Sequence, residues 1–454
     1  MNITERLAQF VADHRFSSLP RDVVELAKWT IADTLGCCIA GYTVAEKECG
    51  WIVDLVKDMG GRAESTVFLD GYRTSAPMAA LANGTMIHTV DFDDTHMGSI
   101  SHFSSSLVPA VFALSERVRV DGAALVEAFV VGFEVGARVG RRMMPSHYKY
   151  WHPTGTFGSL AAAAAACKLL RFDAAQTEQA LGLAADQAAG LRYCVDKGDY
   201  SKSLHPGAAA MRGVMMALLV AKGANGPEGI FEYPTGFCQA FSEDPDVEKI
   251  AEGLGRSYEI GSNSLKAYPT ILCSHSSIQA LREMMKDHAV EERDIARIRL
   301  RVSATAKGQG MNYDPTTALA ARLSIPFCVS MAVVDRDVSL HEFNEERLAD
   351  PRIREVMRRI EIQDDPAMTL QYPETIASIA EIETRSKGTI RHEVIYPKGN
   401  VRNPLSKEEV ATKFRGLASV TLPQDQCEEL LASLFRLDEL SSTDELIRLL
   451  RKRR

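Results

Sequence analysis

Two long runs of small side chains constrain the fold more than any other feature of the sequence. Residues 159–170 read SLAAAAAACKLL, and residues 207–223 read GAAAMRGVMMALLVAKG. Small side chains on both sides of a helix let neighbouring helices approach closely, and a helix without a wide polar face is normally buried. We therefore expect both runs to form central helices that are packed on all sides and do not lie on the surface.

Apolar residues recur every three or four positions through most of the first 222 residues, which predicts further helices. The helical segments predicted are 7–40, with a start signal at Pro20, and 76–88, 104–118, 123–143, 156–170, 175–190 and 206–222. The pattern changes after residue 261. A two-residue alternation there predicts half-buried antiparallel strands at 294–305, 378–384 and 390–396, with helices at 276–288 and 346–360.

The fold class expected from this pattern is mainly α, with a large all-helical domain built from both chain ends and a smaller α+β lid domain. The chain has 454 residues, which is too long for one ordinary domain. The mixed segment 265–401 has a normal domain size. Because helical periodicity resumes after it, we expect residues 402–454 to rejoin and complete the helical domain of residues 1–264.

Composition argues against several classes of function. The net charge is −8 and the basic residues are scattered, apart from the terminal RLLRKRR, so no nucleic-acid partner is expected. No apolar run reaches the roughly 18 to 20 residues that a membrane span requires, and the N-terminus lacks the pattern of a secretory signal. The nine cysteines form no CxxC pair and are expected to be reduced core residues. These features predict a soluble cytoplasmic protein.

The stretch NGTMIHTVDFDDTHMGSISHFSSSLVP holds the densest set of side chains able to do chemistry. If a helix continues through it, His88, Asp91 and Thr95 share one face, and Asp93 points elsewhere. The glycine and serines that follow end such a helix, so His102 is expected on a turn that folds back over this face. An imidazole, a carboxylate and a hydroxyl that meet in this way suggest proton transfer.

Two histidines each precede a proline, His152 before Pro153 and His205 before Pro206. Proline suits the first position of a helix and keeps the preceding residue extended, so each imidazole should project from a helix N-terminus. The partial positive charge there attracts anions and disfavours protonation, which leaves a neutral ring able to act as a base. The alternative is that each histidine only caps its helix.

Several basic residues near these histidines could hold an anionic substrate. Lys202 lies three residues before His205, and Lys266 lies in LKAYP, which leads to His275. A fixed cation near an imidazole suits a carboxylate ligand. Arg192 is a weaker candidate of the same kind. The alternative for each is a solvated surface residue.

The sequence contains no recognisable metal or nucleotide motif. The run that begins at Asp91 resembles a calcium loop, but His96 stands where glycine is required and His102 where the closing glutamate belongs. HExxH, Cys/His zinc spacings, GxGxxG after a strand, GxxxxGK[ST] and GxSxG are missing. We therefore expect no metal and no cofactor.

Five ordered motifs give the chain a resemblance to the MmgE/PrpD family, which includes 2-methylcitrate dehydratase, cis-aconitate decarboxylase and iminodisuccinate epimerase. They are VVELAKWTIADTLGCCIAG, LANGTMIHTVDFDDTH, WHPTGTFGSLAAAAAA, KSLHPGAAAMRGVMMALLVAKGANGPEGIFE and LKAYPTILCSHSSIQAL. The resemblance implies a helical domain built from both chain ends, a smaller α+β lid, a homodimer, and metal-free lyase or isomerase chemistry on small di- or tricarboxylates.

The family's site positions carry over to residues of this chain. They fall on Asp91, Thr95, His102, His152, Lys202 and His275. Phe103 stands where proline usually follows the histidine, and Phe327 stands where the decarboxylase has a site tyrosine; the gap before His102 is also one residue longer. These differences weigh against decarboxylation more than against membership of the family.

We interpret the chain as a cofactor-free lyase in which His102 or His152 removes a proton next to a substrate carboxylate. Lys202 and Lys266 would neutralise the carboxylates, and His275 would protonate the departing hydroxyl. Dehydration of a citrate-like acid is the reaction expected, with epimerisation or decarboxylation as alternatives. Other classes also stay open, namely a non-catalytic helical binding protein and a metal hydrolase. The candidate site set is catalytic His102, His152, Lys202, His275 and Asp91, and substrate-binding Thr95, Lys266, His205, Arg192 and His88.

Overall fold

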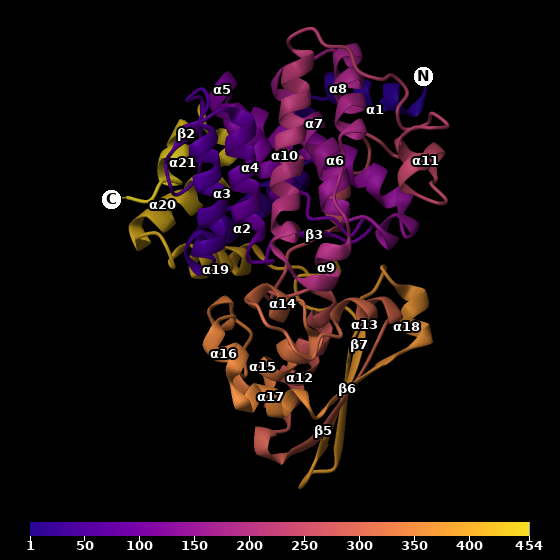
Figure 1. Cartoon of the computed structure of the whole chain (residues 1–454), viewed down its shortest axis with the longest axis vertical. Helices are drawn as coiled ribbons and strands as arrows, with labels where there is room; N and C mark the ends of the chain where they lie inside the picture. The colour runs from indigo at the N-terminus through magenta and orange to yellow at the C-terminus, as the bar shows by residue number, and fades with distance from the viewer. Residues whose placement is uncertain (454) are drawn as a thin grey trace.

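The computed structural model describes residues 1–453, and its fold is mainly α (Figure 1). A large helical part occupies the upper half of Figure 1, and a smaller α+β part lies below it. The helices of the first 241 residues are α1 (Ile3–Asp13), α2 (Arg21–Val44), α3 (Glu46–Met59), α4 (Ala76–His88), α5 (Ser104–Val118), α6 (Gly122–Met143), α7 (Pro153–Leu169), α8 (Ala174–Asp186), α9 (Tyr193–Lys197), α10 (Tyr200–Val220) and α11 (Phe237–Phe241).

The small-residue runs form α7 and α10, which pack against each other, and α10 also packs on α4. A side chain at Gly84 would place its Cβ 2.7 Å from the Cα of Gly207, so α4 and α10 touch backbone to backbone. The alanines of α7 are fully buried, as predicted. The prediction that α10 is buried on all sides is wrong, because Met215 and Leu219 are 41% and 45% exposed on its outer face.

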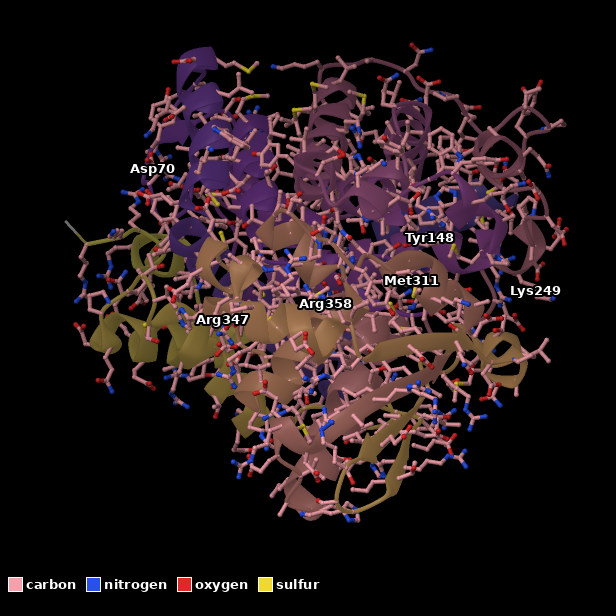
Figure 2. All side chains as sticks on the ribbon, turned by 60° about the horizontal axis from the view of Figure 1, so that its bottom comes forward. Asp70, Tyr148, Lys249, Met311, Arg347 and Arg358 are labelled. Atoms are coloured by element: carbon pink, nitrogen blue, oxygen red, sulfur yellow. The ribbon has the colours of Figure 1, made fainter. Side chains whose placement is uncertain are left out.

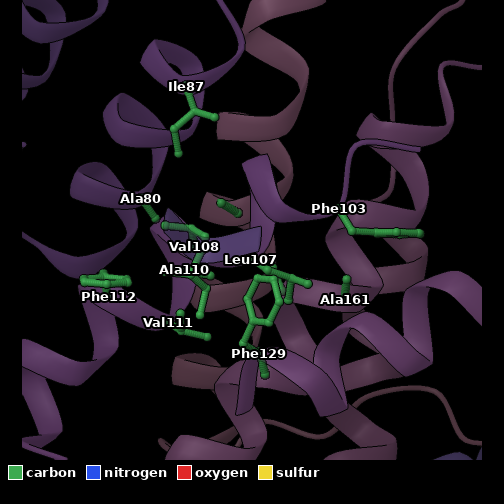
Figure 3. Close-up of a cluster of buried hydrophobic side chains, with 14 of the residues drawn as sticks. Ala80, Ile87, Phe103, Leu107, Val108, Ala110, Val111, Phe112, Phe129 and Ala161 are labelled. Atoms are coloured by element: carbon green, nitrogen blue, oxygen red, sulfur yellow. The ribbon is translucent and has the colours of Figure 1, made fainter. Parts of the chain in front are cut away.

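Large aliphatic and aromatic side chains fill the centre of the helical part. Figure 3 shows this core, where Leu107 of α5 lies near Phe129 of α6, Phe112 of α5 lies further to the left, and Phe103 lies near Ala161 of α7. All five side chains have no exposed surface. Burial of apolar side chains makes the largest favourable contribution to the free energy of folding. The packed helices therefore hold the polar segments between them in fixed positions.

Both chain ends contribute to the helical part. The C-terminal helices α19 (Lys407–Ala418) and α20 (Gln424–Phe435) pack on α2, and α21 (Asp444–Leu449) packs on α20. Lys413 of α19 forms a 2.7 Å ion pair with the fully buried Asp33 of α2. The predicted fold class is therefore confirmed. The domain bounds at 264/265 and 401/402 stay a prediction.

The α+β part has its own hydrophobic core, which runs from Tyr268 to Val394. Its helices are α12 (His275–Asp287), α13 (Ala304–Gly310), α14 (Ala318–Arg322), α15 (Ile325–Asp335), α16 (Glu345–Ala349), α17 (Pro351–Met357) and α18 (Pro366–Gln371). The strands are β5 (Ile295–Val302), β6 (Ile360–Asp364), β7 (Ser378–Thr384) and β8 (Thr389–Val394), in the order β6-β5-β7-β8.

The predicted strands at β5, β7 and β8 are present and pair antiparallel, with α12 packed on β7 and β8. The sequence did not predict β6, which pairs parallel to β5. A single helix over 346–360 was predicted there. Instead α16 and α17 are separate helices, because Pro351 begins the second one and cannot continue the first.

Two pairs of short strands connect loop segments that precede the α+β part. The strand β3 (Thr95–His96) pairs antiparallel with β4 (Asn263–Ser264), and Thr95 lies opposite Ser264. A second short pair joins β1 (Ser65–Thr66) and β2 (Arg73–Thr74). The first pair matters for function, because it sets the segment around Lys266 against the segment around Asp91.

All nine cysteines lie within the described residues and are buried and unpaired, as expected for core thiols. Among residues 1–453, α10 is the one helix whose length and composition would allow it to cross a membrane. Its inner face packs on α4 and α7, which accounts for its apolar character without a membrane.

Candidate active site

A small cavity with a volume of about 50 Å³ lies at the border between the helical part and the α+β part. Tyr148, which is labelled in Figure 2 near the meeting line of the two parts, belongs to its wall. Six residues predicted from the sequence also line it: Asp91, Thr95, His102, His152, Lys202 and Lys266. A cavity of this volume holds a few water molecules, so its polar lining, more than its size, marks it as a candidate site.

The segment that follows α4 is not a helix, so the prediction that residues 88, 91 and 95 share a helical face is wrong. The helix ends at His88, and Thr95 lies in β3. Asp91 between them has a φ of 49°, a left-handed conformation that costs energy for a residue other than glycine. This turn points the Asp91 carboxylate into the cavity. Helical periodicity could not predict such a conformation.

Asp91 holds two ammonium groups together. Its Oδ1 accepts hydrogen bonds from Lys202 Nζ at 2.9 Å and Lys266 Nζ at 3.0 Å, and its carbonyl accepts a second bond from Lys266 at 2.8 Å. All three side chains are almost fully buried. Burial alone would raise the pKa of Asp91, but the two lysines bring it well below its usual value. On the cavity wall itself, two cations face one carboxylate, so the wall can bind an anionic ligand.

His88 lies behind the cavity wall and connects Lys202 to Asp93. Both carboxylate oxygens of Asp93 lie 2.9 Å from His88 Nδ1, and Lys202 Nζ lies 2.8 Å from His88 Nε2. An ammonium group can only donate, so His88 Nε2 must accept and Nδ1 must carry the proton. Burial lowers the pKa of His88, in agreement with a neutral ring. His88 therefore positions Lys202 and has no free nitrogen for a substrate.

His102 folds back towards His88, as predicted, with ring centroids 4.7 Å apart. Its Nδ1 lies 2.6 Å from the carbonyl oxygen of Asp94. A carbonyl can only accept, so Nδ1 carries the proton and Nε2 is left as an acceptor without a partner among residues 1–453. Burial holds the pKa of His102 well below its usual value, against the opposing effect of Asp93. The ring is thus a neutral base on the cavity wall.

Asp93 was predicted to point away from this group, and that prediction is wrong. Its Oδ2 lies 3.8 Å from His102 Nδ1, in addition to the bonds it accepts from His88. The neighbouring Asp94 accepts a hydrogen bond from the hydroxyl of Ser104. Burial and the charge of Asp93 raise the pKa of Asp94 to about 7. The two adjacent carboxyl groups therefore differ in protonation near neutral pH.

His152 precedes the first residue of α7, as predicted, and its side chain forms no capping hydrogen bond. The reading that it only caps the helix therefore fails. Its Nδ1 lies 2.9 Å from Nδ1 of His205, and one of the two donates to the other. Burial first, and then His205 and Lys202, hold the pKa of His152 well below its usual value. The ring is neutral and faces the cavity from the positive end of a 17-residue helix.

The prediction for His205 is wrong in its local structure. Pro206 does not open a helix, because α10 begins earlier at Tyr200 and contains both residues. His205 therefore projects from the second turn of α10 and contacts the outer side of His152. It does not line the cavity, so its placement gives no direct role in substrate binding.

Two other candidates also lie outside the cavity wall. Arg192 pairs with Asp196 at 2.5 Å and stacks its guanidinium over Tyr148 at 5.5 Å, so it supports the wall from behind. His275 begins α12 and packs edge-on against Tyr268 in the core of the α+β part. Burial lowers the pKa of His275 to about 3. The structure gives it no contact with the cavity, so the predicted proton donor must come from elsewhere.

Several wall residues were missed by sequence reasoning. The polar ones are Tyr148, Tyr372 and Gln309, and the apolar ones are Met97, Ile100, Val195, Ile271, Leu272, Cys273, Leu323 and Ile376. Some lie inside the quoted motifs, such as Ile271 and Cys273, but no residue type or spacing marks them as site residues, and only the fold brings the set together. Phe327 lies fully buried in the core of the α+β part and away from the wall. The missed residues make much of the cavity aliphatic, opposite its cationic end.

Three groups of side chains in the described chain bring nitrogen, sulfur or oxygen atoms close enough to hold a metal ion. Two of them include His88, whose ring nitrogens are already engaged by Asp93 and Lys202. A cation there would have to displace an ammonium group. The third group is His152, Cys194 and His205. The absence of a catalytic metal stays a prediction.

The cavity lies between the helical part and the α+β part, and its wall holds two lysines together with unprotonated imidazoles. This arrangement is typical of an enzyme. Comparison with known families agrees, since the MmgE/PrpD N-terminal domain matches residues 5–250 and the C-terminal domain matches residues 268–437. The chain belongs to the MmgE/PrpD family.

Relatives with curated names align over nearly the whole chain. Human cis-aconitate decarboxylase is 28% identical, with 99% of this chain and 95% of the relative covered, and the enzyme of that name from Aspergillus terreus is 25% identical, with 99% and 96% covered. The mitochondrial 2-methylcitrate dehydratase of Yarrowia lipolytica is 24% identical, with 95% and 86% covered. The names of these relatives denote two kinds of lyase.

Proposed function

We propose that the protein is a lyase of small di- or tricarboxylates that works by proton abstraction next to a carboxylate. One observation carries this proposal, namely the 2.6 Å hydrogen bond between His102 Nδ1 and the Asp94 carbonyl. It leaves the neutral His102 Nε2 as a base on the wall of a cavity that also holds Lys202 and Lys266. A base and two cations are what abstraction of a weakly acidic carbon-bound proton requires.

In the proposed dehydration, Lys202 and Lys266 bind the carboxylate next to the reacting carbon. His102 Nε2 takes the proton from that carbon, and the electron pair moves into an enediolate whose charge faces the two ammonium groups. The pair then forms the double bond as the hydroxyl leaves with this same proton, which passes from His102 to the acceptor Nε2 of His152 and on to the leaving oxygen, giving water and an unsaturated acid. His152 takes this role because it lines the cavity and His275 does not. Both imidazoles are neutral again when the water has formed, so the enzyme returns to its starting state.

Decarboxylation is the second candidate, and the cis-aconitate decarboxylases that align over 99% of the chain favour it. Loss of carbon dioxide leaves the same kind of carbanion, which Lys202 and Lys266 would stabilise. That reaction needs a proton donor and no base. Because Nε2 of the neutral His102 can accept a proton, it supports dehydration over decarboxylation. It supports epimerisation equally, since that reaction has the same first step.

A panel of citrate, 2-methylcitrate and cis-aconitate followed by NMR separates these outcomes. In heavy water, abstraction by His102 predicts deuterium at the carbon next to a carboxylate together with loss of water. Loss of carbon dioxide without prior exchange would favour the second candidate. The variants His102→Ala and Lys202→Ala should lose activity by roughly 10²- to 10⁴-fold. The exposed His288→Ala is the matched control.

Turnover at the wild-type rate in both cavity variants would overturn the proposal. Binding without turnover, seen as a rise in melting temperature with every acid of the panel, would favour a non-catalytic binding protein. A homodimer and a cytoplasmic location remain part of the proposal, supported by the family resemblance and by the unpaired cysteines. Light scattering of the purified protein tests whether it is a homodimer.

A further inference from the structure

A second cluster of potential ligand atoms lies behind the cavity, on the side of His152 away from Lys202. Cys194 of α9 places its Sγ 3.7 Å from Nδ1 of His205, and His205 Nδ1 lies 2.9 Å from Nδ1 of His152. The three residues come from α9, α10 and the start of α7, so the tertiary fold brings them together. All potential ligand atoms lie within 4.8 Å of one another.

Two of the three separations lie close to those around a tetrahedral metal ion. Zinc bonds of about 2.0 to 2.1 Å to nitrogen and about 2.3 Å to sulfur place neighbouring ligand atoms roughly 3.3 to 3.6 Å apart. The observed sulfur to nitrogen distance already lies close to that range. The two imidazole nitrogens need to separate by only a few tenths of an ångström. Two imidazoles and a thiolate form a donor set that zinc prefers over harder cations.

We propose that Cys194, His205 and His152 form a zinc-binding site that regulates the cavity. The other two candidate clusters of the described chain use His88, whose nitrogens are held by Asp93 and Lys202. The nitrogens of the proposed site are paired only with each other and with a thiol. Cys194 and His152 are buried, whereas His205 is partly exposed and gives an ion a path from solvent. A water molecule completes the fourth position.

Zinc binding changes protonation in a defined way. The Cys194 thiol loses its proton to solvent as the sulfur binds the metal. Whichever ring held the shared proton on Nδ1 must carry it on Nε2 instead, because a coordinating nitrogen has no proton. His152 is then fixed with a hydrogen on Nε2, facing the cavity, and cannot accept a proton there. On the proposed function, zinc therefore slows turnover, because the His102 proton can no longer pass through Nε2 of His152 to the leaving hydroxyl.

The test uses the full chain, stripped of metal by chelator and dialysis, with zinc and cobalt(II) as probes. Wild-type protein should bind one zinc ion per chain by calorimetry. Cobalt should give the near-ultraviolet charge-transfer band of a thiolate ligand. Cys194→Ser should lose the band and weaken zinc binding at least tenfold, with its metal-free activity unchanged. Cys273→Ser, which removes the thiol on the cavity wall, is the matched control and should keep the band.

The binding measurements do not depend on the proposed reaction, so they stand even if no acid of the panel is turned over. Absence of a thiolate band in the wild type would overturn the site, and so would a band that survives Cys194→Ser and disappears in Cys273→Ser. If activity is found, zinc should inhibit the wild type and spare Cys194→Ser. Equal inhibition of both would show that zinc acts at another place and would overturn the regulatory role.

Discussion

The ammonium group of Lys202 donates to Nε2 of His88 at 2.8 Å. His88 is held in turn by the Asp93 carboxylate, so a buried carboxylate, an imidazole and an ammonium group form a chain that ends at the cavity. The bond to Asp93 keeps the His88 proton on Nδ1, and Nε2 of His88 is then free to accept from Lys202. The cation that faces the substrate is therefore aimed by groups that never touch the substrate.

This chain predicts a measurable role for His88. Replacement by alanine leaves Lys202 bonded only to Asp91 and free to turn, so kcat should fall about 10- to 100-fold and KM should rise. Steady-state kinetics on the substrate found by the panel gives both constants. His288→Ala, on an exposed residue, should match the wild type. A His88→Ala enzyme with unchanged kcat and KM would show that Lys202 needs no support from behind.

The neutral state of His102 predicts the pH dependence of activity. Burial lowers its pKa below the ordinary histidine value of 6.5, and the base is active only when unprotonated. Activity should therefore persist as the pH falls below 6.5 and decline only at the lower pKa, about tenfold per pH unit. The profile of kcat/KM against pH reports this group in the free enzyme. An acid limb with its midpoint at or above 6.5 would contradict the assignment.

Part of the candidate site could be predicted from the sequence, because short-range sequence signals determine it. Pro153 fixes the start of α7, so the position of His152 at that helix end follows from two residues. The same reasoning failed for His205. Asp199 caps α10 upstream by accepting from Ser201, and the helix then runs through Pro206. A proline therefore predicts the start of a helix correctly only where no stronger N-cap residue lies nearby.

Other features depend on contacts between distant segments. Lys266 meets Asp91 because β4 pairs with β3, and each of these strands has only two residues, too short for any periodicity to mark. Asp91 itself adopts a left-handed conformation that hydrophobic patterning does not encode. Tyr148 and Tyr372 reach the cavity from segments with no motif. Both cations were predicted from the residues around them, and Lys202 also through the family resemblance, whereas the other wall residues required the folded structure.

The adjacent carboxyl groups predict a pH-dependent stability. The pKa of Asp94 is raised from 3.8 to about 7 by burial and by Asp93, so the folded state holds this proton more tightly than the unfolded state. Stability should therefore fall as the pH rises from about 4 to 7, at a cost of up to roughly 4 kcal/mol. Asp94→Asn removes this cost while keeping an acceptor for Ser104.

Melting temperatures of Asp94→Asn and the wild type, measured at pH 6 and pH 8.5, test this expectation. The wild type should lose more stability than the variant between the two conditions, and the variant should be the more stable protein at pH 8.5. Other titrating groups act equally on both proteins, so the difference isolates Asp94. Parallel changes in the two proteins would mean that Asp94 is already ionised at pH 6.

The close contact between α4 and α10 predicts the effect of adding one methyl group. A Cβ at Gly207 would lie 2.3 Å from the carbonyl oxygen of Leu81, which belongs to a helix backbone and cannot move aside alone. Gly207→Ala should therefore destabilise the protein by about 2 to 3 kcal/mol. Gly416, in the exposed part of α19, has nothing within 4 Å of its added Cβ, so Gly416→Ala should stabilise by about 0.5 to 1 kcal/mol through helix propensity. Thermal melts of the two variants should move in opposite directions, and a Gly207→Ala protein as stable as the wild type would refute the backbone contact.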